Sequence, residues 1–308
     1  MKHAWRLLVA FALAALPADA IADPSALTYA FDFSKHEIGV NVTVKGMPLF
    51  MLLDTGVEPS IVDRVRATAL GLPVDRGNAS EGSGFGSGKA MASPATIAGL
   101  KIGGHAYPDV DALALDTAAI SKGYGRPVDG VLGYSFLKDK AVLIDYAATT
   151  ITVLSGAREA EELTHSCRSH YSIPLVFLGD NHWPVISEFH VGDATAAVTL
   201  DTGSSRRIGF YQIALQTKAI RDALKVTGSN TGAGARGSFT SKTAVLGLPV
   251  GLGPLRLPAG GIVSILPANG QSDKVVANIG NAMLAEISPE LLLDYAGKTV
   301  SFYGDCAR

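Results

Sequence analysis

One short sequence occurs twice in this chain, and each copy directly follows an apolar run. Residues 52–56 read Leu-Leu-Asp-Thr-Gly and residues 199–203 read Thr-Leu-Asp-Thr-Gly. The two aspartates are 201 − 54 = 147 residues apart. A repeat whose period is the size of a domain indicates a duplicated folding unit rather than a solenoid of short repeats. We therefore expect two related lobes, each of which contributes one aspartate.

The repeat extends well beyond the tripeptide. The same offset aligns Val44 with Val191, Leu132-Gly133 with Ile279-Gly280, and Leu137 with Leu284. An offset of 294 − 145 = 149 aligns residues 143–146 with residues 292–295. Each half thus reads as a strand, Asp-Thr-Gly, a helix, a Gly-rich stretch, further strands, an apolar pair before glycine, a short helix and a hairpin.

Hydrophobic periodicity predicts mainly β-structure with short helices. Residues 40–44 alternate between apolar and polar types, which is typical of a half-buried strand, and residues 49–53 form an apolar strand that ends at Asp54. The remaining expected elements are a helix over residues 60–70, strands within 96–115, a one-turn helix after 130–133, a hairpin over 141–154, a helix over 211–224 and a Gly-rich stretch at 228–237.

Composition narrows the function classes. The chain has 308 residues, of which 47% are hydrophobic, so it can bury one or two substantial cores. The net charge of −2 provides no basic field for nucleic acid, and we expect no nucleic-acid partner.

The N-terminus resembles a signal peptide over residues 1–22. Basic residues precede a ten-residue apolar stretch, residues 7–16, and small residues suitable for cleavage follow at 18–20, with 20–22 as a second choice. The apolar stretch is too short to span a bilayer. We expect an exported protein, periplasmic in a Gram-negative cell or otherwise secreted, with no stable membrane insertion after cleavage. The alternative is an uncleaved membrane tether.

Cys167 and Cys306 are the two cysteines, and they are 306 − 167 = 139 residues apart. In an oxidising compartment we expect them to form a disulfide; the alternative is two unrelated thiols. Two distant cysteines without clustered histidines predict no metal site.

Two carboxylates brought together by the repeat would suit acid–base chemistry on water. Like charges about 3 Å apart cannot both ionise, so Asp54 and Asp201 would share one proton. The ionised group can then take a proton from water while the protonated group donates to a carbonyl oxygen. Glycine after threonine allows close backbone approach, and threonine supplies a short hydroxyl for hydrogen bonding across the junction.

These motifs resemble the pepsin and retropepsin clan of aspartic proteases. The likeness rests on both Asp-Thr-Gly motifs and on the later segments at residues 131–133 and 278–280; the Asp-Tyr pairs at 145–146 and 294–295 are similar to exported bacterial retropepsin-like proteins. It implies a mainly β, bilobal pepsin-like acid protease fold, with two homologous β-barrel-like lobes, short helices and an interlobe cleft for an extended peptide. In that family the later segment crosses beneath the aspartate as a ψ-shaped loop.

The resemblance also assigns domains and roles. We expect a signal peptide at 1–22, an N-terminal protease lobe at 23–154, an interlobe linker at 155–170 and a C-terminal lobe at 171–308. Asp54 and Asp201 would be the catalytic dyad of a monomer that needs no cofactor and no metal. The supporting residues would be Thr55, Gly56, Thr202, Gly203 and Ser204.

Three features depart from the family pattern. Val57 follows the first motif whereas Ser204 follows the second, so the two carboxylates are expected to differ in their hydrogen bonding. Arg206 and Arg207 follow the second motif, and we expect both to face solvent because charges are rarely buried unpaired. The alternative is that they bind an acidic group of the substrate. Third, the flap tyrosine of pepsins has no clear match here, and the expected flap lies within residues 82–88, at Gly84, Phe85 and Gly86; the alternative is an ordinary surface loop.

Other catalytic motifs are incomplete. His36-Glu37 begins a zinc-helix pattern that has no second histidine, and neither a phosphate-binding loop nor a G-x-S-x-G elbow is present. Asp145 and Asp294 lie in hairpins, where turn capping is expected. The sequence therefore favours an exported aspartic endopeptidase. The alternatives are a non-catalytic peptide-binding or inhibitor protein on the same fold, and a structural envelope protein that retains the motifs as relics.

Overall fold

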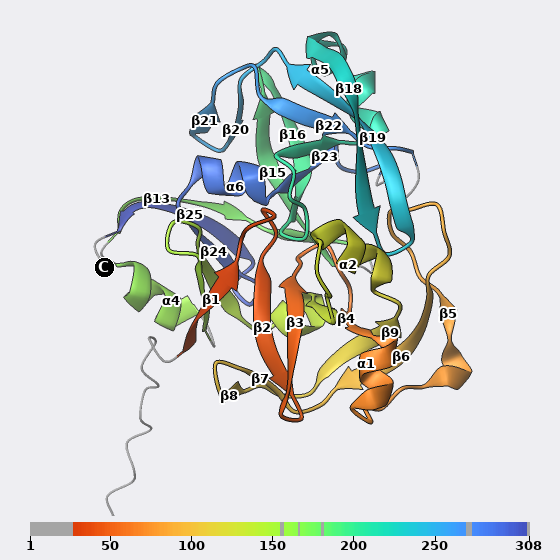
Figure 1. The fold of residues 1–308 in the computed structure, drawn as a ribbon. Coiled ribbons are helices and arrows are strands. Elements are labelled where there is room, and N and C mark those ends of the chain that lie inside the picture. The colour runs from red at the N-terminus through yellow and green to blue at the C-terminus, as the bar shows by residue number, and fades with distance from the viewer. Residues whose placement is uncertain (1–26, 155–156, 166, 180–181, 269–272, 307–308) are drawn as a thin grey trace, which may run out of the picture.

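The computed structural model describes residues 27–154, 157–165, 167–179, 182–268 and 273–306, and the expected signal peptide at 1–22 lies outside them. Within these ranges two groups of strands form an upper and a lower lobe (Figure 1), as the duplicated sequence predicts. One large cluster of buried hydrophobic residues contains side chains from both halves of the chain. The fold is mainly β and bilobal, as expected.

The elements of the first half are β1 (Thr28–Asp32), β2 (Gly39–Val44), β3 (Met47–Leu53), β4 (Ser60–Asp63), α1 (Arg64–Ala69), η2 (Arg76–Asn78), β5 (Ser80–Glu81), β6 (Met91–Ile97), β7 (Leu100–Ile102), β8 (His105–Ala106), β9 (Val110–Leu115), α2 (Ala118–Tyr124), β10 (Gly130–Leu132), α3 (Tyr134–Leu137), β11 (Ala141–Asp145) and β12 (Thr150–Leu154).

The elements of the second half are α4 (Ala157–Thr164), β13 (Cys167–Pro174), β14 (Val176–Leu178), β15 (Trp183–Val191), β16 (Ala194–Asp201), β17 (Ile208–Phe210), η3 (Gln212–Gln216), α5 (Lys218–Ala223), β18 (Leu224–Gly234), β19 (Gly237–Leu246), β20 (Val250–Leu252), β21 (Leu255–Leu257), β22 (Ile262–Ile265), β23 (Ala277–Gly280), α6 (Asn281–Ile287), β24 (Glu290–Asp294) and β25 (Thr299–Cys306).

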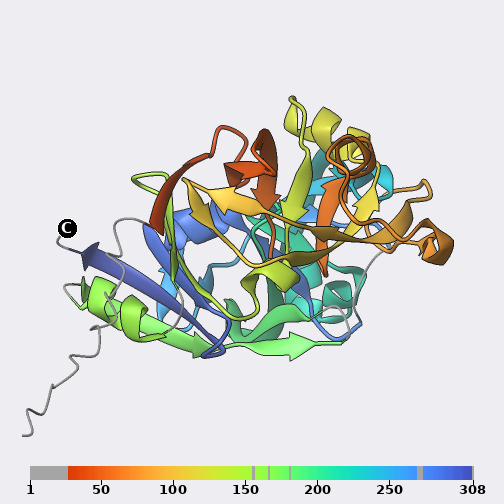
Figure 2. The same cartoon turned by 90° about the horizontal axis from the view of Figure 1, so that it is seen from below.

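A shared sheet joins the two halves. Its strand order is β13-β25-β24-β11-β12-β1, and the central antiparallel pair, β11 with β24, places Leu143 opposite Leu292. These two leucines are also related by the sequence offset, 292 − 143 = 149, so equivalent strands pair about a local two-fold axis. Helix α4 packs on this sheet through Ala160, and Figure 2 shows α4 beside β25, the dark blue strand. The expected linker at 155–170 thus contains a helix and the start of β13.

Two local expectations need correction. Residues 60–63 form strand β4 rather than the first turn of a helix, because Ser60 to Asp63 pair in parallel with β9 and Ser60, Ile61 and Val62 are buried. Pairing and burial override a helical pattern in so short a segment. Residues 211–224 form η3 and α5, separated at Thr217, instead of one helix. The expected strands within 96–115, the helix after residue 133 and the hairpin over 141–154 are confirmed.

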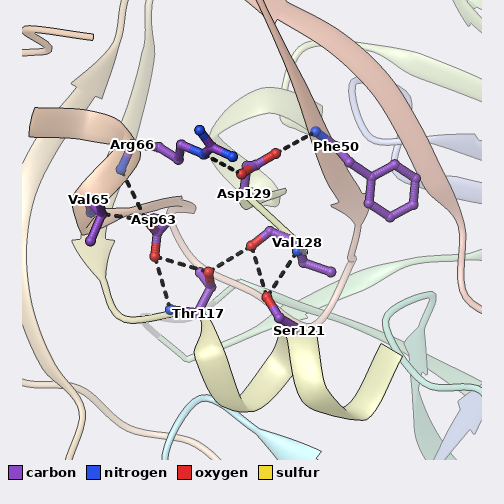
Figure 3. A network of polar contacts seen from close by, with 8 residues as sticks. All are labelled: Phe50, Asp63, Val65, Arg66, Thr117, Ser121, Val128 and Asp129. Atoms are coloured by element: carbon purple, nitrogen blue, oxygen red, sulfur yellow. Dashed lines mark hydrogen bonds and ion pairs between the residues drawn. The ribbon is translucent and has the colours of Figure 1, made fainter. Parts of the chain in front are cut away.

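A network of polar contacts around Asp129 and Asp63 holds the strand that leads to Asp54 (Figure 3). Asp129 accepts hydrogen bonds from the Phe50 amide of β3 at 2.9 Å and from Arg66 Nε of α1 at 2.7 Å. Asp63 caps the N-terminus of α1 by accepting from the amides of Val65 and Arg66 at 2.9 and 3.0 Å. Since β10 begins directly after Asp129, this network ties β3, α1 and β10 together and holds the end of β3 in place.

Candidate active site

Asp54 and Asp201 occupy equivalent positions in the two lobes. Asp54 directly follows β3, and β10 runs parallel to β3 with Leu132 beside Leu53. Asp201 ends β16, and β23 runs parallel to it with Gly280 beside Asp201. In each lobe the later strand lies between the aspartate strand and the next one, β4 or β17. These are the crossings that the resemblance implied for residues 131–133 and 278–280.

The two threonines of the motifs lock the lobes together with reciprocal hydrogen bonds. Thr55 Oγ1 donates to the Leu200 carbonyl at 2.7 Å and accepts from the Thr202 amide at 3.1 Å. Thr202 Oγ1 donates to the Leu53 carbonyl at 2.9 Å and accepts from the Thr55 amide at 3.1 Å. Both side chains are buried, so each bond is shielded from water. The lock brings the two aspartates to one place.

The two glycines provide amides and space for the carboxylates. The Gly56 amide donates to Asp54 Oδ1 at 2.7 Å, and the Gly203 amide donates to Asp201 Oδ1 at 3.1 Å. A Cβ atom at residue 203 would lie 2.1 Å from Asp54 Oδ2, and one at residue 56 would lie 3.3 Å from Asp201 Oδ1. Each carboxylate therefore lies against the glycine of the opposite lobe, and residue 203 has no room for a side chain.

Asn278 makes the pair asymmetric. Its Nδ2 donates to Asp201 Oδ2 at 2.7 Å. The repeat aligns Asn278 with Val131, since 278 − 131 = 147, and valine has no donor for Asp54. Aligning the two halves of the sequence shows this difference, because the second half has an asparagine where the first has a valine. The hydrogen bonding of the two carboxylates differs, as expected, but the residue responsible is Asn278 rather than Val57 or Ser204.

The electrostatics follow this asymmetry. Burial, and then the charge of Asp201, raises the pKa of Asp54 well above its usual value. Burial also raises the pKa of Asp201, but the hydrogen bond from Asn278 and the positive charge of Arg206 oppose this rise. The two groups are within hydrogen-bonding reach of each other and titrate as a pair. In the singly protonated pair, the proton is favoured on Asp54 and the negative charge on Asp201.

Ser204 stabilises the second Asp-Thr-Gly motif through backbone hydrogen bonds. Its amide bonds to the Asp201 carbonyl at 3.1 Å, and its own carbonyl accepts from the Asn281 amide at 2.9 Å. Asn281, at the start of α6, also donates through Nδ2 to the Thr202 carbonyl at 2.6 Å. Tyr146 of the first half donates to Asn281 Oδ1 at 2.9 Å. The Asp-Thr-Gly-Ser turn is therefore held by the C-terminal helix and, through that helix, by the other lobe.

Glu37 is a third carboxyl group near the pair, and the sequence analysis did not identify it as a site residue. It lies just before β2 and is only partly exposed. Burial, and then the charge of Asp201, raises the pKa of Glu37 to about 7, whereas a hydrogen bond with Ser205 and the charge of Arg206 oppose the rise. A first-lobe residue thus contributes charge next to the second-lobe aspartate.

The surroundings of Arg206 differ from those expected from the sequence. We expected Arg206 and Arg207 to face solvent, yet the Nε atom of Arg206 is buried and its guanidinium lies 5.1 Å from the centre of the Phe239 ring. The charge of Arg206 acts on both Asp201 and Glu37. Arg207 instead pairs with Glu286 on α6, with an Nε to Oε2 distance of 2.7 Å. The two adjacent arginines therefore have different surroundings.

The flap candidate meets a hairpin from the opposite lobe. Gly84, Phe85 and Gly86 lie in the loop between β5 and β6, where the sequence predicted a loop. The Phe85 carbonyl accepts from the Arg236 amide at 3.0 Å, and the Gly88 amide donates to the Arg236 carbonyl at 2.7 Å. Phe85 also packs on Phe239, with ring centres 5.0 Å apart. The Gly-rich stretch at 228–237 forms most of β18 and its turn into β19, so the Gly-rich segments of both lobes meet.

The other singled-out residues lie away from the dyad. Asp145 and Asp294 cap hairpin turns, as expected, by accepting from the amides of Ala148 and Gly297 at 2.8 and 2.7 Å. Cys167 and Cys306 are direct partners in the antiparallel register of β13 and β25. The side chain of Cys306 lies outside the described residues, so the disulfide stays a prediction.

The described residues contain neither a metal-binding cluster nor a membrane-spanning helix. Among them, no three or more His, Cys, Asp or Glu side chains are grouped so that they could hold a metal ion. No helix in the same part of the chain has the length and apolar character needed to cross a membrane.

Comparisons with known proteins were made by family model, curated sequence and solved structure. Residues 40–136 match the family model described as aspartyl protease. No curated protein matches the chain. Similar solved structures include basic 7S globulin from soybean, with 13% identity and a TM-score of 0.47, and conglutin gamma, a basic 7S globulin from lupine seeds, with 11% identity and a TM-score of 0.49; each comparison covers 91% of this chain and 94% of the other. Residues 40–136 are thus similar to aspartyl proteases, and the two-lobed β fold and the paired Asp-Thr-Gly motifs are features that the resemblance implied.

Proposed function

We propose that the protein is an aspartic endopeptidase, in which Asp54 and Asp201 together activate water for peptide-bond hydrolysis. The observation that carries this proposal is the reciprocal threonine lock, which brings one carboxylate from each lobe against the glycine of the other. Since one chain supplies both carboxylates, we further propose that the monomer is the active unit. Its substrate would be a peptide or protein held extended between the lobes.

The asymmetry of the pair supports a different proposed role for each carboxyl group. Asp201, stabilised as an anion by Asn278, accepts a proton from the attacking water. Asp54, whose pKa is raised further, donates its proton to the oxygen of the scissile carbonyl. The water oxygen bonds to the carbonyl carbon, which gives a neutral tetrahedral diol. Asp201 then returns its proton to the leaving amine as the C–N bond breaks, and Asp54 regains its proton from the diol.

A peptide-library digest of the purified mature protein tests this proposal. We expect hydrolysis at acidic to neutral pH that a transition-state-mimicking aspartic protease inhibitor stops and a chelator does not. Asp54→Asn and Asp201→Asn should each abolish hydrolysis and leave the cooperative unfolding transition in place. Full activity in either variant would refute the dyad, and loss of activity to a chelator would indicate a metal enzyme.

Peptide binding without cleavage is the result that the alternative function predicts. The same library, captured on the wild-type protein and identified by mass spectrometry, measures binding without any need for turnover. Intact peptides captured in the absence of any cleavage product would replace the endopeptidase with a peptide-binding or inhibitor protein. Cleavage that the inhibitor abolishes would exclude a purely structural envelope role.

We also propose that the protein is exported and carries one disulfide. The signal-like segment at 1–22 and the opposed register of Cys167 and Cys306 support this. A bridge that closes so long a loop stabilises the fold by about 4–5 kcal/mol at most. Intact-mass analysis under non-reducing conditions should find a mature chain that begins near residue 23 and lacks two hydrogens. A cytoplasmic, full-length protein with two alkylatable thiols would contradict both parts.

A further inference from the structure

Two neighbouring arginines after the second motif differ in how their charges are balanced. Arg207 makes a two-pronged contact with Glu286, with Nε to Oε2 at 2.7 Å and Nη2 to Oε1 at 3.0 Å. Arg206 forms no ion pair within 4.0 Å in the described part of the chain, and its Nε is buried without a hydrogen-bond acceptor there. A buried guanidinium nitrogen without an acceptor is costly, so the retention of Arg206 beside the dyad needs a reason.

The β18–β19 hairpin forms the wall against which Arg206 lies. The guanidinium is near the Phe239 ring of β19, and a Cβ atom at Gly232 of β18 would lie 2.4 Å from its Nη2. Figure 1 shows this hairpin reaching from the second lobe towards α2 of the first, and a Cβ at Gly123 of α2 would lie 2.7 Å from the Ala233 side chain. Arg206 therefore lies against a hairpin of the second lobe that also contacts the first lobe.

The acidic groups near Arg206 leave its hydrogen-bonding capacity unused. Asp201 and Glu37 are the two carboxylates whose charges act on it. Asp201 is instead hydrogen-bonded to Asn278 and Gly203, and Glu37 to Ser205. They attract the guanidinium over a distance but occupy none of its donors. An arginine with its planar fork of donors free is suited to bind a carboxylate with two hydrogen bonds.

We propose that Arg206 is a specificity-determining residue, which binds a carboxylate side chain, Asp or Glu, of the peptide substrate on the Asp201 side of the dyad. This inference rests on the proposed peptidase function. The peptide carboxylate would provide the partner that Arg206 lacks, and the Phe239 ring would support the flat face of the guanidinium. A lysine at the same peptide position would meet the positive charge of Arg206 and be rejected.

The test uses matched peptides that differ only in charge at one position. A sequence cleaved in the library digest is resynthesised with Glu, Gln or Lys at each position that flanks the scissile bond. The kcat/KM ratio between the Glu and Gln peptides is measured for wild type, Arg206→Met, Arg206→Glu and Arg207→Met. A ratio within one enzyme cancels any effect of the substitution on the dyad itself, since both peptides undergo the same chemistry.

We expect wild type to favour Glu over Gln by roughly 10- to 100-fold at one position, as charged hydrogen bonds allow. Arg206→Met should bring that ratio close to unity, and Arg206→Glu should favour the Lys peptide. Arg207→Met, the matched control, should keep the wild-type ratio because Arg207 is already paired with Glu286. A wild-type ratio near unity at every position, or a preference that survives Arg206→Met, would overturn the inference.

The outcomes separate this inference from the proposed function. Cleavage of both peptides at equal rates refutes the role of Arg206 and leaves the endopeptidase intact. If no peptide is cleaved, the proposed function fails, and anisotropy of the same peptides carrying a fluorophore then measures their affinity for the wild-type protein. Tighter binding of the Glu peptide, lost in Arg206→Met, would support the carboxylate site, and equal binding would refute it.

Discussion

Replacing Asn278 by valine makes the second lobe match the first, where Val131 stands at the equivalent position. The substitution removes the Nδ2 hydrogen bond to Asp201 Oδ2 at 2.7 Å and with it the main opposition to the raised pKa of Asp201. Hydrogen bonds to charged groups are worth about 1.5–3 kcal/mol, and one pKa unit corresponds to about 1.4 kcal/mol. The pKa of Asp201 should therefore rise by about 1 to 2.

The direction of the activity change follows from the role of Asp201 as the base. In the proposed mechanism hydrolysis needs ionised Asp201, so activity should fall as pH drops through its pKa. Removing Asn278 raises that pKa, and the acidic limb of the kcat/KM profile should move about 1 to 2 pH units upward. At a pH below both limbs, Asn278→Val should therefore lose roughly 10- to 100-fold in kcat/KM.

The fold should tolerate this change. Asn278 is 5% exposed, and its Oδ1 atom is buried without a hydrogen-bond partner in the described part of the chain. Valine also removes this unsatisfied acceptor, which offsets part of the loss of the hydrogen bond to Asp201, so the free energy of unfolding should fall by no more than about 3 kcal/mol. A pH profile measured on a cleavable peptide, together with urea unfolding, separates the two effects. An acidic limb that does not move would refute the assignment of the negative charge to Asp201.

Three further perturbations have expected outcomes. Burial and the charge of Asp201 raise the pKa of Glu37 from 4.5 to about 7, so folding favours the protonated form of this carboxyl group. The contribution of protonated Glu37 to stability is complete below pH 4.5 and is lost as pH rises through 7. The free energy of unfolding should therefore fall less between pH 4.5 and 7 in Glu37→Gln than in wild type, by roughly 3 kcal/mol at most. Urea unfolding at several pH values measures this, and the same pH dependence in variant and wild type would contradict it. Thr202→Val leaves the Thr55 amide and the Leu53 carbonyl without their partner and should lower the free energy of unfolding in urea by about 1–3 kcal/mol. Thr202→Ser keeps the hydroxyl and should recover most of this loss. Equal stabilities of the two variants would contradict a stabilising role of the threonine hydroxyl. Gly203→Ala places a Cβ against the Asp54 carboxylate and should lower kcat by roughly 100-fold or more. Gly56→Ala should cause a smaller loss, because the carboxylate oxygen nearest to its Cβ is 3.2 Å away. Unchanged turnover in Gly203→Ala would contradict the close approach of Asp54 to residue 203.

The repeat in the sequence predicted the main architecture because duplication makes distant residues equivalent. The positions of Asp54 and Asp201, the threonine contacts across the junction and the crossings of β10 and β23 all follow from that equivalence. Local pattern failed at β4, since pairing with β9 decides the conformation of residues 60–63.

The charges around the dyad could not be predicted in the same way. Glu37 lies 54 − 37 = 17 residues before Asp54, and it reaches Asp201 only through the packing of the first lobe against the second. Arg206 was expected in solvent because charged side chains usually are, but its guanidinium lies against the β18–β19 hairpin, where Gly232 leaves room for it. Asn278 could have been found from the alignment, since Val131 occupies the matching position.

The central claim is that two repeated motifs in one chain form one catalytic site. Titration of peptidase activity with a tight-binding transition-state-mimicking inhibitor, at protein concentrations well above its dissociation constant, tests this claim directly. We predict a linear fall to zero activity at one inhibitor molecule per chain. An end point at half an inhibitor per chain would mean a site shared by two chains, and an end point at two would mean two independent sites; either result would contradict a single site built from both lobes.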